Sequence, residues 1–174
     1  MAIDRKKLVT RHNPVLTAAD ASSPLTVGNG GFAFTADVTG LQTLYAQYAG
    51  VTPLCTMSHW GWHSFPGHHD YHEVDLTEYD FNGRSVRYAV EKKPGNEEVY
   101  DWLRQNPHRL NLGRVSLLLD GREIIEISNV RQELNLWEGI LYSTFTVVGM
   151  ACRVVTACAP HEDTVPFAVT GEAA

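Results

Sequence analysis

Two short dipeptides constrain the fold of this chain more than any other feature. Asn82-Gly83 separates residues 76–81 from 84–90, and Asp120-Gly121 separates residues 115–119 from 123–127. Both dipeptides supply the positive φ angles of a two-residue type I′ turn, which joins two antiparallel strands. The sequence therefore predicts two β-hairpins.

Further strands are predicted towards the C-terminus. Residues 132–137 alternate in polarity, with Gln132, Leu134 and Leu136 on one side, as expected for a half-buried strand. Residues 140–148 and 151–158 are rich in Val, Ile, Thr and aromatic side chains, and we expect a hairpin turn between them at Gly149-Met150.

An additional strand pair is expected near the N-terminus. Residues 31–40 and 41–49 are both rich in β-forming residues and meet at Gly40, and residues 28–31 form a glycine-rich bend before them. The strands towards the C-terminus follow one another at short spacing with no helical pattern between them, which indicates an antiparallel sandwich or barrel. We therefore expect one mostly-β domain over residues 1–174.

One short helix interrupts the strands. Asn96 is a suitable N-cap, Glu97 and Glu98 suit the positive end of the helix dipole, and Pro107 ends the helix. The following His108-Arg109 belongs to a polar loop that serves either as a helix stop or as a surface for a second domain, and the helix stop is favoured.

Composition excludes several classes of protein. The net charge of −6 and the absence of a Lys/Arg-rich stripe argue against nucleic acid as a partner. No segment approaches the roughly 18 apolar residues of a membrane span, so no membrane partner is expected. The three cysteines, Cys55, Cys152 and Cys158, form no CxxC motif, and we interpret them as buried free thiols of a cytoplasmic protein.

The segment 58–72 is unusually rich in histidine around Trp60 and Trp62. It holds five of the eight histidines of the chain: His59, His63, His68, His69 and His72. Zinc needs three or four converging ligands. His59 and His63 would converge on a helix, which the glycines and proline of this segment oppose, and the His68–His72 set does not match a cupin pattern. A metal site is therefore ranked below a sugar site, and no cofactor is expected.

The tryptophans favour a sugar site. If the chain is extended here, Trp60 and Trp62 lie on one face, because side chains two residues apart share a face. Two indoles then form a flat apolar platform for the C–H face of a sugar ring, while His59, His63 and Asp70 bond to its hydroxyls. The alternative is that the tryptophans belong to the core and the histidines are solvated.

Three stretches add a family resemblance. They are SPLTVGNGGFAFTADVTGLQT at 23–43, CTMSHWGWHSFP at 55–66 and DWLRQNPHRLNLGRVSL at 101–117. Together they resemble the N-terminal region of bacterial six-hairpin glycosidase-type proteins, similar to glycoside hydrolase family 65. The resemblance implies an antiparallel β-sandwich of the supersandwich, galactose-mutarotase-like type, followed by an (α/α)6 barrel that carries the catalytic carboxylates.

The barrel is absent from these 174 residues, and the C-terminal stretch resembles a truncated sandwich. No motif marks a catalytic carboxylate among Asp37, Asp70, Glu73, Asp75, Glu138, Glu162 and Asp163. We therefore expect no catalytic residue and no activity from this part of a glycoside hydrolase alone. The expected role is to support the barrel and to contribute the loop from Trp60 to Asp70 to the sugar pocket. The alternatives are a freestanding carbohydrate-binding module, a structural interaction domain or, less favoured, a histidine-rich metal-binding domain.

Overall fold

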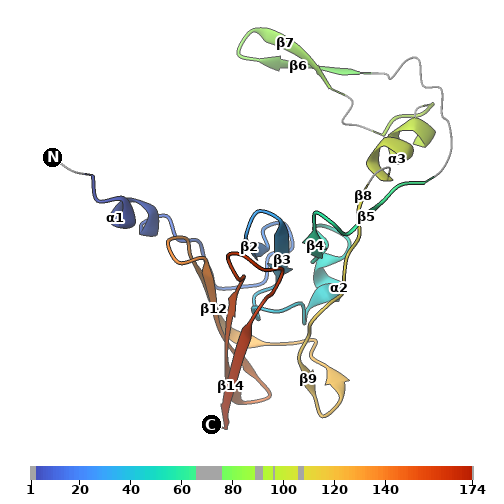
Figure 1. The fold of residues 1–174 in the computed structure, drawn as a ribbon. Coiled ribbons are helices and arrows are strands. Elements are labelled where there is room, and N and C mark those ends of the chain that lie inside the picture. The colour runs from blue at the N-terminus through green and yellow to red at the C-terminus, as the bar shows by residue number, and fades with distance from the viewer. Residues whose placement is uncertain (1–2, 66–75, 89–91, 96, 106–107, 174) are drawn as a thin grey trace. The chain divides into compact units, whose positions relative to one another are not determined.

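The computed structural model describes residues 3–65, 76–88, 92–95, 97–105 and 108–173. The chain is mostly β, with antiparallel sheets and short helices (Figure 1). It divides into two compact units, one of residues 1–59 with 111–174 and one of residues 60–110. The expectation of a single sandwich domain over residues 1–174 stays a prediction.

The larger sheet of the first unit has five antiparallel strands in the order β1-β11-β12-β13-β14. Their bounds are β1 Val15–Leu16, β11 Ser128–Asn135, β12 Ile140–Val147, β13 Met150–Ala157 and β14 Phe167–Ala173. Positive φ angles of 48° at Val148 and 77° at Gly149 close the β12–β13 hairpin. The turn lies one residue earlier than predicted, because Met150 already pairs with Val147.

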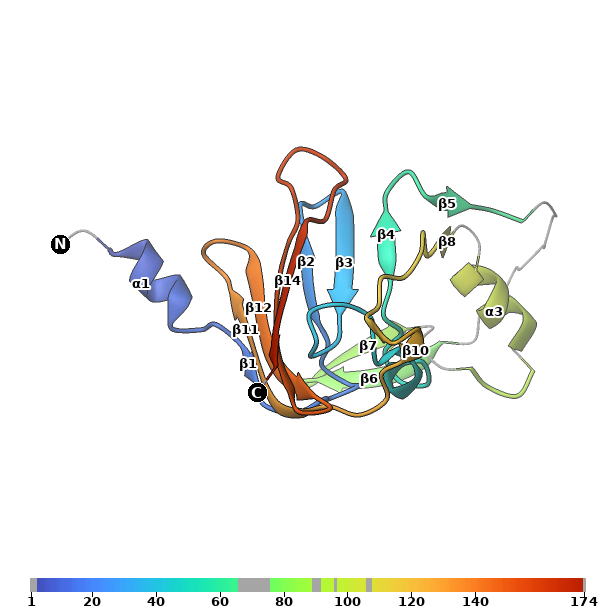
Figure 2. The same ribbon diagram turned by 90° about the horizontal axis from the view of Figure 1, so that it is seen from below.

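The second sheet of this unit packs against the first. It consists of β2 Leu25–Gly28, β3 Phe32–Ala36 and β4 Thr56–Ser58. Phe32 and Phe34 of β3 are buried in one cluster with Leu141 of β12, and the ring of Phe34 meets Phe167 of β14 edge-on at 5.2 Å between centroids. Figure 2 shows β2 and β3 alongside β12 and β14. These contacts confirm the predicted antiparallel β-sandwich.

The glycine-rich bend between β2 and β3 is organised by Asn29. Its Oδ1 accepts hydrogen bonds from the N–H groups of Gly31 at 3.0 Å and Phe32 at 2.8 Å. Its Nδ2 donates to the carbonyl oxygens of Ala159 and Glu162, both at 3.1 Å. The predicted bend is confirmed, and one side chain ties it to the β13–β14 connection.

The predicted strand at 41–49 is wrong. These residues form turns and the short helix α2, Tyr45–Tyr48. The reason is the buried carboxylate of Asp37, which accepts hydrogen bonds from the N–H of Thr39 at 2.7 Å and of Leu44 at 2.5 Å. These bonds fold the chain back on itself after β3, so its backbone groups do not enter a sheet.

Both dipeptide hairpins are confirmed. In the first unit β9, Leu118–Leu119, pairs with β10, Arg122–Glu123, across Asp120 and Gly121, with φ of 50° and 75°. In the second unit β6, Thr77–Phe81, pairs with β7, Arg84–Tyr88, across Asn82 and Gly83, with φ of 54° and 81°. The β9–β10 strands are shorter than predicted, with two residues each.

The predicted helix is α3, Glu97–Gln105, in the second unit. Its expected cap Asn96 and stop Pro107 lie outside the described residues. A further helix, α1 Arg5–Thr10, was not predicted; it is capped by Asp4, whose Oδ1 accepts from the N–H of Lys7 at 3.0 Å.

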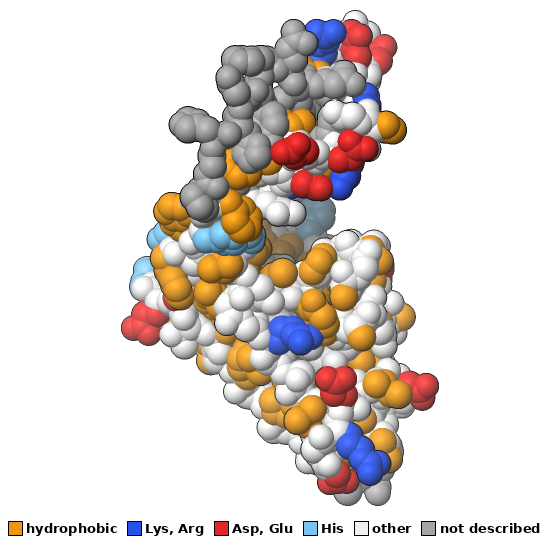
Figure 3. Space-filling view, turned by 90° about the vertical axis from the view of Figure 1, so that its right-hand side faces the viewer, with side chains coloured by type: hydrophobic (Ala, Val, Ile, Leu, Met, Phe, Trp, Pro, Cys, Tyr) orange, Lys and Arg blue, Asp and Glu red, His pale blue; other side chains and the backbone are white. Residues whose placement is uncertain are grey.

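Within the described ranges, no helix is both long and apolar enough to cross a membrane. In the space-filling view, charged side chains of both signs lie among hydrophobic and other uncharged ones over the lower part of the face shown (Figure 3).

Candidate functional site

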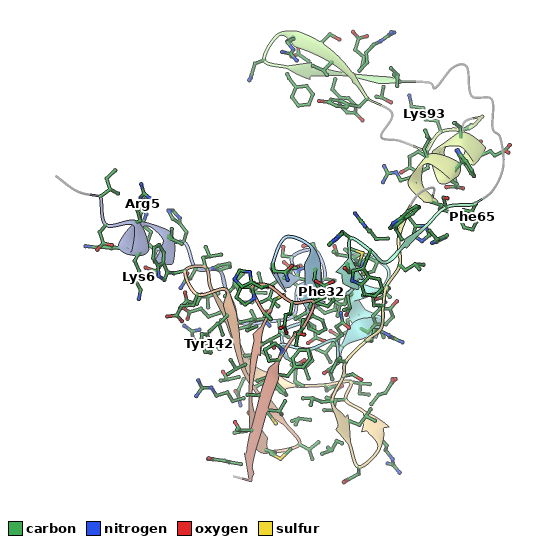
Figure 4. The ribbon with its side chains drawn as sticks, viewed as in Figure 1. Arg5, Lys6, Phe32, Phe65, Lys93 and Tyr142 are labelled. Carbon is green, nitrogen blue, oxygen red and sulfur yellow. The ribbon has the colours of Figure 1, made fainter. Side chains whose placement is uncertain are left out.

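The histidine-tryptophan segment enters a two-stranded sheet of the second unit. Strand β5, Trp62–His63, pairs antiparallel with β8, His108–Arg109. Trp62 lies opposite Arg109 and His63 lies opposite His108. Phe65 lies two residues after the end of β5 (Figure 4). The loop expected at His108-Arg109 is therefore a strand, because it pairs with residues that lie far away in the sequence.

The Trp62–Arg109 pair joins an aromatic surface to a group of hydrogen-bond donors. The Trp62 side chain is 56% exposed and Arg109 is also exposed. Residues directly opposite in an antiparallel pair share a face of the sheet. One face of this small sheet therefore presents an indole next to a guanidinium, whose N–H groups form a rigid planar fork.

Trp60 is also exposed, at 61%, but the chain is not extended between the two tryptophans. The N–H of Trp62 donates to the carbonyl oxygen of Trp60 at 3.1 Å, which is a tight turn centred on Gly61. The rule that residues two apart share a face applies to an extended chain, so it does not apply here. Gly61 is buried and its carbonyl oxygen accepts from the N–H of Leu110 at 2.7 Å.

His63 belongs to a cluster of rings on the other side of the strand. The rings of His63 and His108 lie 3.9 Å apart between centroids at an angle of 73°. The ring of Phe65 meets His63 edge-on at 4.9 Å. The Nδ1 atom of His63 is buried and makes no hydrogen bond, whereas Nδ1 of His108 lies 2.7 Å from the carbonyl oxygen of Gln105.

The remaining predicted site residues lie elsewhere. His59 belongs to the first unit, where its N–H donates to the carbonyl oxygen of Gly31 at 2.8 Å and its Nδ1 lies 3.1 Å from the same oxygen. Asp70 lies outside the described residues. The structure thus brings Trp62 and His63 together with His108 and Arg109, while the roles of His59 and Asp70 stay predictions.

The predicted histidine ligands are covered only in part. His68, His69 and His72 lie outside the described residues, as do Glu73 and Asp75. In the part of the chain that the structure describes, no group of three or more His, Cys, Asp or Glu side chains is placed to hold a metal ion.

Asp37 is a buried carboxylate of the sandwich. It is fully buried, and burial raises the pKa of its carboxyl above the ordinary value of 3.8, against the opposing effect of its hydrogen bonds to Thr39 and Leu44. Each of these contacts organises the turn after β3. Asp37 therefore has a structural role.

Sequence reasoning missed a cavity of about 510 Å³ in the first unit, between α2 and residues 114–125. The guanidinium carbon of Arg114 lies 3.9 Å from the centre of the Tyr45 ring. Gln42 uses its side chain internally: Nε2 donates to the Thr35 carbonyl oxygen at 3.0 Å and Oε1 accepts from the N–H of Val115 at 3.3 Å. Arg114 and Gln42 of the cavity wall thus make contacts within the protein, and no sequence motif indicated the cavity.

Comparison with known proteins finds no match for this chain among protein-family models, curated proteins or solved structures. The site must therefore be interpreted from its own geometry.

Proposed function

We propose that this chain binds carbohydrate through the face that carries Trp62 and Arg109, as the N-terminal sandwich domain of a six-hairpin glycoside hydrolase. The observation that carries the proposal is the pairing of an exposed Trp62 with Arg109 across β5 and β8. The resemblance of residues 23–43, 55–66 and 101–117 to the family similar to glycoside hydrolase family 65 supports the choice of ligand.

The chemistry of a sugar suits this pair. The C–H face of a pyranose ring stacks on an indole, which offers a large rigid apolar surface. The guanidinium donates to ring hydroxyls on the same side of the sheet. Trp60, two residues before Trp62, is a second exposed indole in this unit. His63 follows Trp62 on β5 and faces the opposite side of the small sheet, so the hydroxyl-bonding roles of His59, His63 and Asp70 stay predictions from the sequence.

The domain itself is proposed to be non-catalytic. Its role is to support an (α/α)6 barrel and to supply the loop from Trp60 to Asp70 to the sugar pocket. The net charge of −6 argues against nucleic acid or an anionic membrane surface as the ligand. The three free thiols support a cytoplasmic protein.

A glycan panel measured by calorimetry tests this proposal. We expect Trp62→Ala and Arg109→Ala each to weaken the affinity for the glycan that the wild type binds best by about tenfold or more, which corresponds to about 1.4 kcal/mol. The matched control is Trp137→Ala, because Trp137 is 47% exposed and lies in the first unit between β11 and β12. It should bind as the wild type does.

Two results would contradict the proposal: no glycan binding by the wild type, or the same loss in the Trp137 variant as in the Trp62 variant. Each titration is repeated with EDTA, which should leave sugar binding unchanged, because stacking and guanidinium contacts need no metal ion.

A further inference from the structure

The two histidines that face each other across β5 and β8 are close enough to share an ion. Their ring centroids are 3.9 Å apart. Two imidazoles bound to one ion at about 2.0–2.1 Å per bond, with bond angles of about 90–110°, have centroids roughly 4.5–5.2 Å apart, so the rings need to move apart by about 1 Å. His63 and His108 are fixed by the strand register rather than by a loop.

The ring nitrogens of both residues are suited to ligation. A carbonyl oxygen only accepts, so Nδ1 of His108 donates to the Gln105 carbonyl at 2.7 Å, which leaves Nε2 with its lone pair. Ligating histidines typically hold the second nitrogen in this way, which fixes the tautomer and the ring orientation. Nδ1 of His63 is a buried polar atom without a hydrogen bond, which is costly unless a ligand satisfies it.

The surroundings of the rings also suit an ion. Phe65 packs against both histidines, at 4.9 Å from His63 and 6.4 Å from His108, and forms part of an apolar shell. The nearest cation in the sequence, Arg109, follows His108 on the same strand. Successive residues of a strand point to opposite faces, so the guanidinium lies on the Trp62 side and not on the histidine side.

We propose that His63 and His108 bind a divalent transition-metal ion, with water in its remaining positions. Imidazole pairs select Cu²⁺, Ni²⁺ and Zn²⁺ over Mg²⁺ and Ca²⁺, which prefer oxygen ligands. Among these ions Cu²⁺ binds most tightly. The site does not depend on the proposed sugar function, and it differs from the histidine sets that the sequence suggested, because His108 lies outside the segment 58–72.

Calorimetric titration of the whole chain with Cu²⁺, Ni²⁺, Zn²⁺ and Mg²⁺ tests the site. We expect binding of the first three ions and none of Mg²⁺. His63→Ala and His108→Ala should each weaken Cu²⁺ binding by about tenfold or more. His161→Ala is the matched control, because His161 is exposed and lies in the first unit. Binding at wild-type affinity in both site variants would overturn the proposal.

A second measurement covers the case in which an alanine variant does not fold. Pulsed electron spin resonance of the Cu²⁺-loaded wild type should show two coordinated imidazole nitrogens, and the milder variant His108→Gln should show one. The same two nitrogens in both proteins would place the ion on other histidines and overturn the proposal. Glycan binding is measured separately with EDTA, so failure of the metal site leaves the sugar proposal untouched.

Discussion

The side-chain Nε2 of Gln132 donates to the main-chain carbonyl oxygen of Asp37 at 2.7 Å, over 95 residues of sequence. The same nitrogen donates to Oγ of Ser143 at 2.9 Å. All three residues are fully buried. A polar network thus joins strands β11 and β12 of the larger sheet to the turn that follows β3 of the smaller sheet.

Loss of this amide should destabilise the sandwich. Gln132→Ala removes two hydrogen bonds to buried acceptors, each worth about 1 kcal/mol, and leaves a cavity, so we expect a loss of about 3 kcal/mol in unfolding free energy. The control Gln47→Ala changes an exposed amide that donates to the Ile125 carbonyl at 3.3 Å. It should stay within about 0.5 kcal/mol of the wild type. Urea unfolding measures both, and equal losses would contradict the prediction.

Gly40 should tolerate no side chain. Its φ is +81°, and an added Cβ would lie 2.9 Å from Oγ of Ser143 and 3.1 Å from Cγ1 of Val154. Its carbonyl oxygen also accepts from Thr156 Oγ1 at 2.7 Å, so the backbone has little room to move. We expect Gly40→Ala to cost about 2 kcal/mol or more, from backbone strain and overpacking together.

Gly50 provides the matched control for that substitution. An added Cβ at Gly50 meets no atom within 4 Å. Gly50→Ala should therefore leave the midpoint of thermal unfolding within a few degrees of the wild type. If Gly40→Ala and Gly50→Ala had the same unfolding midpoint, the contacts around Gly40 would not exclude a side chain at that position.

Asp37 should make stability fall as pH rises. Its pKa is raised by burial, so the folded state holds the proton more tightly than the unfolded chain does. This contribution is fully present below the ordinary value of 3.8 and is lost as pH rises through the folded pKa. The unfolding free energy of the wild type minus that of Asp37→Asn should therefore decrease between acidic and neutral pH. Urea unfolding at several pH values measures the difference, and an increase would be the wrong sign.

The cysteines should react slowly in the folded protein. All three are free, and burial raises the pKa of Cys55, Cys152 and Cys158, with the charge of Asp163 adding to the effect at Cys158. Thiolate is the reactive form, so modification by Ellman's reagent near neutral pH should be slow. In urea, three thiols per chain should react rapidly. Fast reaction of all three without denaturant would show that the sandwich does not protect them.

Local chemistry predicted part of the fold well. Asn82-Gly83 and Asp120-Gly121 specify their own φ angles, so the hairpins needed no knowledge of the rest of the chain. The β-forming composition of residues 140–148 and 151–158 likewise identified the strands β12 and β13. The prediction failed at residues 41–49, whose composition suits a strand, because the Asp37 carboxylate accepts from the N–H of Leu44 in that segment and of Thr39 just before it.

At the candidate site, too, the sequence predicted some features and missed others. The sequence singled out Trp60, Trp62 and His63 as unusual, but it did not reveal their neighbours. His108 and Arg109 were interpreted as a helix stop, since nothing local indicates that they pair with Trp62 and His63. The sequence analysis also considered an extended chain at Gly61. The hydrogen bond from the N–H of Trp62 to the carbonyl oxygen of Trp60 shows a turn there instead.

By itself, the sequence determined the antiparallel β class, the turns and the aromatic-rich segment, because turn geometry and side-chain alternation act over a few residues. Only the tertiary structure decided which strands pair, and with that the meeting of Trp62 with Arg109 and of His63 with His108. The tertiary structure also determined that Asp37 is buried and that its carboxylate holds the turn after β3. The physical reason is that strand pairing and burial depend on groups far apart in the chain, which no short stretch of residues encodes.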